Sequence, residues 1–324
     1  MSATTTPGSA ARFALSGEVT RIGFRLLAVA LLCAGLAIAS PVFATPTNIM
    51  NVLRQAALLF FMASGLTLVV LTAGLDLSIG AIIGLAACVA GTVMKATGQP
   101  ALAVVLALGI GAGVGLFNGL LVAVIRIPSF IATYGMLWIL QGLTYTYMAG
   151  STVFGFPRAF RSFGNGFVLG VPIPVVVMVG SLVLLALFAG RTTWGQQVYA
   201  IGANPVAARL SGIPVQRRLI LVYTLSGLAA GLAALVFLAR LNSAEADIGS
   251  SLTLPAVAAV LIGGTSLFGG VGTLFGTFIG ALLLTLVLNG MNLLQIDARW
   301  QPLVTGVIIV AAVWIDLQTS RRKA

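Results

Sequence analysis

The sequence contains no histidine and only six acidic residues among its 324 residues. The lack of histidine removes the commonest general base and the commonest zinc ligand. The few carboxylates form no close pair inside an apolar run, so no catalytic centre is predicted. Lysine occurs only at Lys95 and Lys323, and neither follows a glycine-rich phosphate loop, which excludes ATP binding through a Walker A motif. The two cysteines, Cys33 and Cys88, lie in apolar runs, where packing is expected instead of a disulfide or a metal site.

Charge of either sign is also scarce. Charged residues make up 7% of the chain and hydrophobic residues 59%, whereas a soluble domain carries about 25% charged residues. This composition predicts an all-α polytopic membrane protein. The formal net charge of +11 does not indicate nucleic-acid binding, because the basic residues are scattered between apolar runs and form no dense patch.

Ten apolar stretches of roughly 20 residues predict about ten transmembrane helices. They lie near 26–43, 51–72, 78–95, 100–124, 130–148, 171–189, 218–240, 252–264, 270–290 and 301–317. The eighth is short and rich in glycine and alanine, which indicates a broken or re-entrant helix buried in protein. Residues 1–25 are expected to be a disordered cytoplasmic tail, 26–318 the membrane domain and 319–324 a second tail. A cleaved signal peptide ending at Ala44 is an alternative for the first span, although the many later spans favour an uncleaved helix.

The basic residues predict an orientation in the membrane. With ten spans and the first tail inside, both termini are cytoplasmic. Eleven basic residues then lie inside and six outside, as the positive-inside rule requires. The inside set is Arg12, Arg21, Arg25, Arg126, Arg191, Arg209, Arg217, Arg218, Arg321, Arg322 and Lys323, and the outside set is Arg54, Lys95, Arg158, Arg161, Arg240 and Arg299.

An internal repeat is indicated by two matches separated by about half the chain. "SGL" occurs at Ser64–Leu66 and at Ser226–Leu228, and glycines at 109, 111, 115 and 119 recur at 270, 272, 276 and 280. Matched elements are five spans apart, so the halves, roughly 45–165 and 171–318, are expected to have inverted topology, a common plan in transporters. The four-residue glycine spacing predicts bare helix stripes that allow close backbone packing. The alternative is that some of these glycines let helices tilt during gating.

Asp76 stands alone inside "TAGLDLSIGAIIGLAA". The predicted spans place it in the turn between the second and third helices, on the cytoplasmic side. "LDLS" has the character of a helix start, so Asp76 or Ser78 is expected to cap the third span. Two alternatives remain, an ion pair with Arg126 or another arginine and a proton-coupling carboxylate.

The longest predicted cytoplasmic segment, 191–217, contains a small helix. Pro205 suits a first helical turn with Asn204 as its cap. Gly212 can close the C-terminus, and Pro214 prevents continuation. The resulting helix of about two turns is either an ordinary connection or a docking element for a cytoplasmic partner.

Four stretches resemble the permease subunits of ribose-type ABC sugar importers. They are "LTAGLDLSIGA", "GLFNGLLVAVIRIPSFIATYGML", "YAIGANPVAARLSGI" and "AAVLIGGTSLFGGVGTLFGTFIGALL". They follow the order of that family and cover nearly the whole chain from about residue 45. The resemblance implies a type II importer permease fold in the bacterial inner membrane.

The resemblance also implies partners. These are a second permease subunit, identical or not, a periplasmic sugar-binding protein, and two cytoplasmic ATP-binding subunits or one double-domain ATPase. ATP and magnesium would bind to that ATPase, and no cofactor is expected in this chain. The resemblance assigns ATPase coupling to Gly202, Asn204, Ala207, Ala208, Arg209, Leu210, Ser211 and Gly212. Two positions depart from the family's pattern, because Pro205 and Val206 follow the asparagine and Thr253 and Pro255 stand where acids are often found.

The sequence therefore predicts a non-enzymatic subunit that moves a sugar or sugar-like small molecule inward by alternating access. The expected path lies at the permease–permease interface. Its candidate residues are Asn118, Ser129, Thr133, Asn289 and Asn292, whose neutral groups suit a neutral sugar but also suit helix packing. The alternatives are an ion-coupled secondary transporter and an ABC permease for another solute. An intramembrane enzyme or a passive scaffold is disfavoured.

Overall fold

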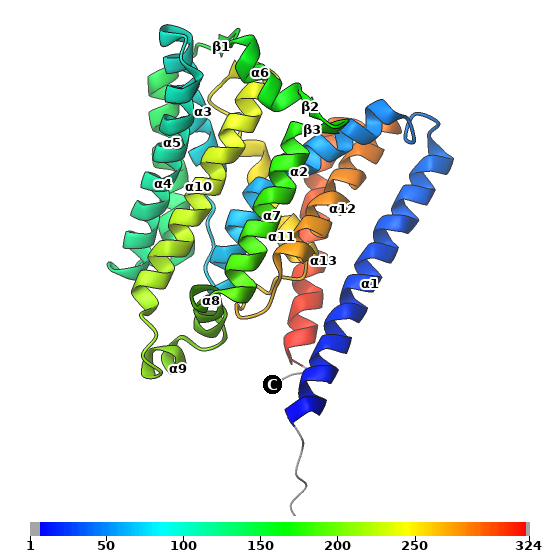
Figure 1. Ribbon diagram of the computed structural model, residues 1–324, viewed down its shortest axis with the longest axis vertical. Helices are drawn as coiled ribbons and strands as arrows, with labels where there is room; N and C mark the ends of the chain where they lie inside the picture. Colours follow the sequence, from blue (N-terminus) through cyan, green and yellow to red (C-terminus); the bar gives the residue numbers. More distant parts are fainter. Residues whose placement is uncertain (1–6, 322–324) are drawn as a thin grey trace, which may run out of the picture.

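The computed structural model describes residues 7–321, and the side chains of residues 22–318. The chain forms a bundle of long helices with very little sheet (Figure 1). Eight described helices are long and apolar enough to cross a membrane. They are α1 (Pro7–Ala39), α2 (Pro46–Leu71), α3 (Ile79–Thr97), α4 (Pro100–Ala123), α7 (Ile173–Arg191), α10 (Val215–Leu241), α12 (Leu274–Leu293) and α13 (Gln301–Arg321).

Two of the ten predicted spans correspond to helices outside this group. One is α5 (Ser129–Met148) and the other is the short α11 (Thr253–Ile262). The all-α polytopic fold is confirmed, and the number ten stays a prediction. The prediction that residues 1–25 are disordered is wrong from Pro7 onward, where α1 begins. No further proline and no two adjacent glycines interrupt this helix. Residues 1–6 and 322–324 lie outside the described chain.

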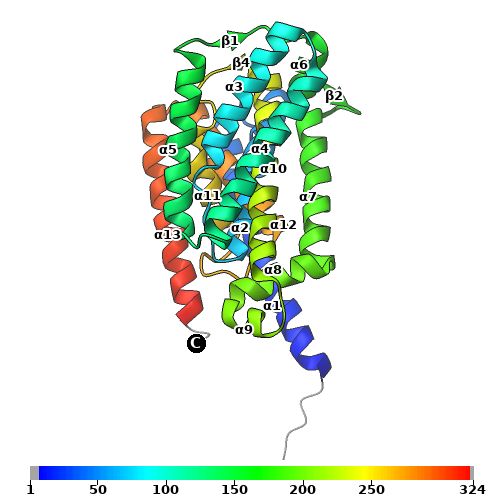
Figure 2. The ribbon, with the colours of Figure 1, turned by 90° about the vertical axis from the view of Figure 1, so that its left-hand side faces the viewer.

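The two ends of the bundle carry different short elements (Figures 1 and 2). The α9 end carries α8 (Thr193–Ala203) and α9 (Pro205–Leu210), together with the start of α1 and the end of α13. The opposite α6 end carries α6 (Arg158–Asn165) and two short antiparallel pairs. In these pairs β1 (Val153–Phe154) joins β4 (Ser243–Ala244), and β2 (Phe167–Val168) joins β3 (Val171–Pro172).

The centre of the bundle is built from α2 and α10, which cross at Gly65 and Ser226. Beyond this crossing, α10 packs on α4, and α2 packs on α12. α4 runs from the α6 end toward the α9 end, whereas α12 runs the opposite way (Figure 1). This exchange of directions around a central pair is the arrangement that an inverted repeat produces.

The predicted glycine stripes are helical only in part. A side chain at Gly111, Gly115 or Gly119 would overlap the backbone of α10, and one at Gly276 or Gly280 would overlap that of α11 or its end. These glycines therefore allow the close packing that was predicted.

The remaining ladder positions were wrongly placed. Gly109 faces open space, and Gly270 and Gly272 lie in the loop 263–273 with φ of 71° and 153°. That loop has to turn sharply between α11 and α12, and glycine tolerates positive φ without strain.

Two segments that lie among the long helices of the bundle are not helical. The first segment, residues 72–78, links α2 to α3. The descending segment, residues 242–252, leaves α10 and follows α3 toward the α9 end. It includes β4 and the 3₁₀ helix η1 (Ser250–Leu252) before α11 begins. Ala244 lies against Gly91, Ala246 against Gly84 and Gly249 against Gly80. The eighth predicted span, 252–264, is the single short helix α11, and the non-helical descending segment precedes it, so a break inside that span stays a prediction. A second 3₁₀ helix, η2 (Ala298–Trp300), precedes α13.

Candidate coupling and transport sites

The small helix predicted in the segment 191–217 is present as α9. It begins directly after the predicted cap Asn204 and ends before Gly212. Asn204 Oδ1 accepts hydrogen bonds from the backbone N–H groups of Val206 and Ala207, both at 3.0 Å. Gly212 adopts a left-handed φ of 79°, and Ile213 N–H donates to the Ala208 carbonyl at 3.1 Å. These interactions satisfy backbone groups at both ends of a helix too short to be stable alone. The local prediction is confirmed.

A second helix, α8, precedes α9 and was not predicted. Thr192 Oγ1 accepts a hydrogen bond from Gly195 N–H at 3.0 Å, which caps α8. "TTWG" carried that capping signal in the sequence. Gly202 lies near the end of α8 and is packed so tightly against the Leu71 carbonyl and Gly270 that a side chain would overlap both.

α8 is linked through these contacts to distant parts of the chain. Gly270 N–H donates to the Leu71 carbonyl at 2.9 Å, and the Tyr199 hydroxyl donates to the Gly272 carbonyl at 2.9 Å. Asp316 on α13 accepts from Ser266 Oγ at 2.9 Å in the same loop. A displacement of α8 therefore acts directly on the end of α2 and on the loop between α11 and α12.

The surface of α9 is an exposed apolar knob, defined here as residues 204–212. Val206 is 67% exposed and Leu210 85% exposed, beside the exposed Arg209. Ala208 is buried against Ile201 and Val215 and anchors the knob. Of the residues assigned to coupling, Gly202 and Ala208 are buried, while Asn204, Ala207, Arg209, Leu210, Ser211 and Gly212 are exposed.

Asp76 is completely buried in the segment 72–78. Its Oδ1 accepts from Ser78 N–H at 3.1 Å and from Ser78 Oγ at 2.6 Å. Its Oδ2 accepts from Ser226 Oγ of α10 at 3.0 Å. Ser78 is the residue before α3, so the carboxylate bonds to a backbone donor at that helix start. Asp76 is thus held by hydrogen bonds, and within the described part of the chain it forms no ion pair with Arg126.

Three of the five candidate path residues meet around this same segment. Asn118 Nδ2 donates to Ser78 Oγ at 2.8 Å. Leu75 N–H donates to Ser129 Oγ at 3.2 Å, and Leu77 N–H donates to Thr133 Oγ1 at 3.1 Å. A non-helical segment at this depth needs such partners, because its backbone groups have no intrahelical bonds. Asn118 and Thr133 are fully buried, so both lie inside the subunit.

The other two candidates lie near the α6 end. Asn289 exchanges two hydrogen bonds with Asn48, at 2.9 and 3.2 Å, and thereby joins α12 to α2. Asn292 is exposed and accepts from Gln301 Nε2 at 2.9 Å. The structure does not bring this pair together with the three residues at the segment 72–78.

The sequence did not predict that α10 contributes two residues to the surroundings of Asp76. Ser226 supplies a donor to Asp76, and the buried Tyr223 hydroxyl lies 3.4 Å from the Leu75 carbonyl. Ser226 belongs to the second "SGL" match, which was the only available signal. The partner could not be inferred from spacing, because it lies half a chain away.

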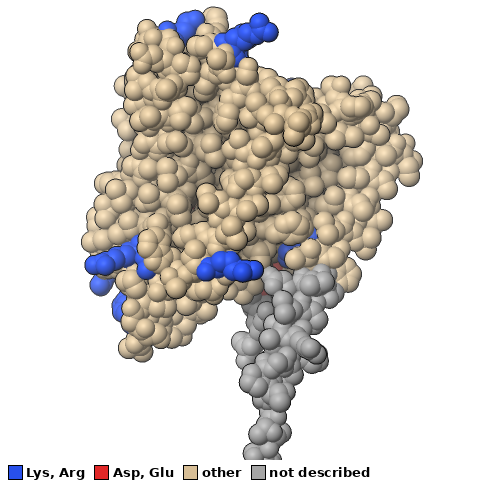
Figure 3. Space-filling view, viewed as in Figure 1, with Lys and Arg blue, Asp and Glu red and all other residues tan. Residues whose placement is uncertain are grey.

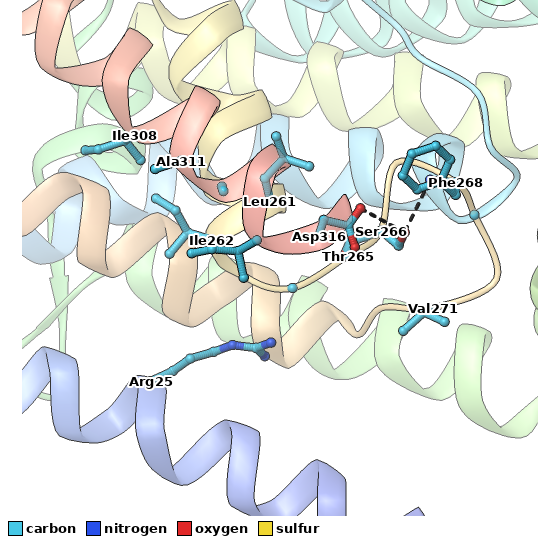
Figure 4. Close-up of a pocket in the computed structure, with 14 residues that line it drawn as sticks. Arg25, Leu261, Ile262, Thr265, Ser266, Phe268, Val271, Ile308, Ala311 and Asp316 are labelled. Carbon is cyan, nitrogen blue, oxygen red and sulfur yellow. Dashed lines mark hydrogen bonds between the residues drawn. The ribbon is translucent and has the colours of Figure 1, made fainter. Parts of the chain in front are cut away.

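A crevice at the α9 end is enclosed by α1, α11, α13 and the loop 263–273 (Figure 4). Its lining is mostly aliphatic. Its carboxylate, Asp316, is occupied by Ser266 Oγ and by Leu267 N–H at 3.2 Å. Arg25 of α1 belongs to the same lining.

The α6 end carries a basic pocket. Arg158, Arg161 and Arg240 line it together with Asn165 and Asn242. Arg54 contributes a further nearby cation, with its guanidinium 4.9 Å from the ring centre of Phe167. Like charges gathered without a neighbouring carboxylate in the lining produce a surface that attracts acidic groups. Lysine and arginine side chains are visible at both ends of the molecule, and scarce between them (Figure 3).

Comparison with known proteins decides the family. The family described as "Branched-chain amino acid transport system / permease component" matches residues 48–313. The chain belongs to this family. The permease is 40% identical over 312 residues to the ribose import permease protein RbsC of Bacillus subtilis (strain 168), covering 95% of this chain and 96% of that protein. The resemblance to ribose-type permeases indicated by the motifs is confirmed.

Two further relatives match most of the chain. The permease is 43% identical over 296 residues to RbsC of Escherichia coli (strain K12), covering 90% and 92% of the two chains. It is 40% identical over 278 residues to the fructose import permease protein FrcC of Rhizobium meliloti, covering 82% and 76%. No solved structure matches the permease. The family and the eight apolar helices make this chain a multi-pass membrane permease.

Proposed function

We propose that this chain is the membrane subunit of an ATP-driven importer that moves a sugar inward. The observation that carries the proposal is identity of 40–43% with sugar import permeases over most of the chain. The sequence contains no Walker A motif, and the proposed source of energy is a partner ATPase. A second permease subunit, identical or paralogous, completes the path.

The α9 knob is the contact for the ATPase. Its exposed Val206 and Leu210 are apolar side chains on the end of the molecule for which the positive-inside rule favours a cytoplasmic location. Movement of the ATPases displaces α8 and α9. Because α8 packs against the end of α2 at Gly202 and donates a hydrogen bond to the loop 263–273 from Tyr199, that displacement reaches the helices of both halves.

The α6 end faces the periplasm and receives the sugar-binding protein. The basic pocket of Arg158, Arg161 and Arg240 attracts acidic groups on that protein and orients it, because complementary charge accelerates association. Both termini then lie in the cytoplasm, and the protein resides in the bacterial inner membrane.

The test is reconstitution of the permease with its ATPase and binding protein in lipid vesicles. Ribose and fructose are offered outside with ATP inside, and a branched-chain amino acid serves as the alternative solute. ATP-dependent accumulation of a sugar is expected. Accumulation driven by an ion gradient without ATP would establish a secondary transporter instead, and ATP-dependent uptake of the amino acid alone would contradict the sugar assignment.

A further inference from the structure

The outward face of α5 differs from that of α7. On α7, the exposed large hydrophobic side chains are all aliphatic, namely Val176, Val179, Val183, Leu184 and Leu187. On α5, Tyr134, Trp138 and Tyr145 are 46%, 58% and 46% exposed. They share a stripe with Phe130 and the half-buried Gln141. Tyrosine and tryptophan facing lipid concentrate at the ends of a span, whereas Trp138 stands in the middle of α5.

The aromatic rings of this stripe form a continuous row. Phe130 and Tyr134 are stacked with ring centres 5.9 Å apart and planes at 2°. Tyr134 and Trp138 meet edge to face at 6.3 Å. From Phe130 to Tyr145 the stripe spans about four helical turns, or ~22 Å of the ~30 Å apolar thickness of a bilayer. It therefore follows the direction that a solute takes through the membrane.

The descending segment supplies a carboxylate to this stripe. Asp247 Oδ1 accepts from Gln141 Nε2 at 3.0 Å and from the Tyr145 hydroxyl at 2.6 Å. Gln141 Nε2 also lies 3.2 Å from the Tyr145 hydroxyl. Both donors reach Oδ1, which leaves Oδ2 to accept from another molecule. Asp247 is exposed.

The cluster of Asp247, Gln141 and Tyr145 lies at about half the height of the bundle, on its surface. The Leu77–Thr133 hydrogen bond aligns the start of α3 with the first turn of α5. Gln141 follows Thr133 by about two turns, or ~12 Å, and so lies level with the middle of α3. Ala246, next to Asp247, contacts Gly84 at that same level. Irregular backbone with an exposed carboxylate at such depth requires a water-filled space.

We propose that the α5 stripe and Asp247 form the solute-recognition surface of the translocation path, and that they select a polyhydroxylated solute. Asp247 Oδ2 accepts from a solute hydroxyl while Gln141 and Tyr145 hold the carboxylate in position. Trp138 and Tyr134 offer flat apolar faces to the C–H face of a sugar ring. The negative charge of Asp247 disfavours phosphorylated or acidic solutes. This inference rests on the proposed sugar-import function and adds the residues that recognise the solute.

The experiment uses the complete importer in lipid vesicles with radiolabelled ribose. It measures ribose taken up and ATP hydrolysed in response to sugar-loaded binding protein. Asp247→Asn and Trp138→Ala are expected to lower uptake about tenfold, the effect of losing an interaction with a charged or aromatic group. Stimulated ATP hydrolysis should stay within about twofold, because the coupling segment is untouched. Trp138→Phe keeps a stacking face and should recover most of the uptake.

A third test variant, Tyr145→Phe, removes a hydroxyl bonded to Asp247 and should reduce uptake. Its matched control on the same helix is Tyr147→Phe, which changes a tyrosine that is 47% exposed outside the stripe and should not reduce uptake. Ile139→Ala, beside Trp138, should also leave uptake unchanged.

Normal uptake by Asp247→Asn and Trp138→Ala overturns the proposal. Parallel loss of uptake, ATP hydrolysis and permease dimerisation also overturns it, since the stripe would then be a subunit contact. If the unsubstituted importer moves no sugar, the proposed function fails first.

Discussion

Ser226 on α10 donates a hydrogen bond to Asp76 Oδ2 at 3.0 Å, and so joins the centre of one half of the chain to the break between α2 and α3 in the other. The carboxylate also bonds to Ser78 and is completely buried. A buried carboxylate with three hydrogen-bond donors holds an irregular segment in one conformation.

Replacing Asp76 with alanine should destabilise the permease by about 2 kcal/mol or more, because hydrogen bonds to a charged group are lost and buried hydroxyls are left unpaired. Ser226→Ala should cost less, about 1 kcal/mol, since the Ser78 bonds remain. Thermal unfolding in detergent, followed by the loss of monodisperse protein, measures both. Asp297→Ala is the control, because that carboxylate is exposed and bonds locally to Arg299, to its side chain at 3.8 Å and to its backbone N–H at 2.9 Å, so its removal should cost less than removal of Asp76.

How much of this site the sequence predicts depends on the range of its interactions. The caps of α9, Asn204 and Gly212, are local signals, and they were predicted correctly. Asp76 bonds to the nearby Ser78 and to Ser226 on α10, and its isolation in the sequence did not identify the α10 partner. Gly270 and Gly272 have helical spacing in the sequence, but the turn between α11 and α12 overrides it.

The same limit explains why Asp247 was overlooked. It stands in a short polar turn after α10 and has no periodic pattern. Only the folded chain brings it to Gln141 and Tyr145, which are 106 and 102 residues away. Deep irregular segments are stabilised by such distant partners, so their functional residues carry a weak local signal.

The α4–α10 contact predicts different effects on stability when each of two neighbouring glycines is replaced with alanine. A methyl group at Gly111 would overlap the Gly227 carbonyl, whereas one at Gly113 meets nothing within 4 Å. Gly111→Ala should therefore lower stability by about 1–3 kcal/mol through overpacking. Gly113→Ala should be neutral or slightly stabilising, because alanine favours a helix over glycine. Thermal unfolding of the two variants compares them directly, and equal loss at both positions would contradict the packing found here.

The α9 knob gives a prediction about association with the ATPase. Leu210→Asp places a charge on an apolar side chain that is 85% exposed, and should weaken co-purification of the ATPase at least tenfold, as expected for a buried interface anchor. Arg209→Glu should weaken it as well if the ATPase presents acidic groups to this helix. Leu169→Asp is the matched control, because Leu169 is fully exposed at the α6 end. Undiminished association of Leu210→Asp together with normal transport would remove the knob from the coupling mechanism.

The basic pocket at the α6 end gives a prediction that depends on salt. Arg158→Glu combined with Arg161→Glu reverses two charges beside Arg240, and should slow association of the sugar-binding protein about tenfold or more at low ionic strength. The Debye screening length falls to roughly 3 Å at 1 M salt. The difference in association rate between the double variant and the unsubstituted permease should therefore shrink at that salt concentration. Association rates measured on nanodisc-embedded permease at the two salt concentrations test this. Arg191→Glu at the opposite end should leave the rate unchanged, and a salt-independent defect in the double variant would indicate a folding change instead of lost steering.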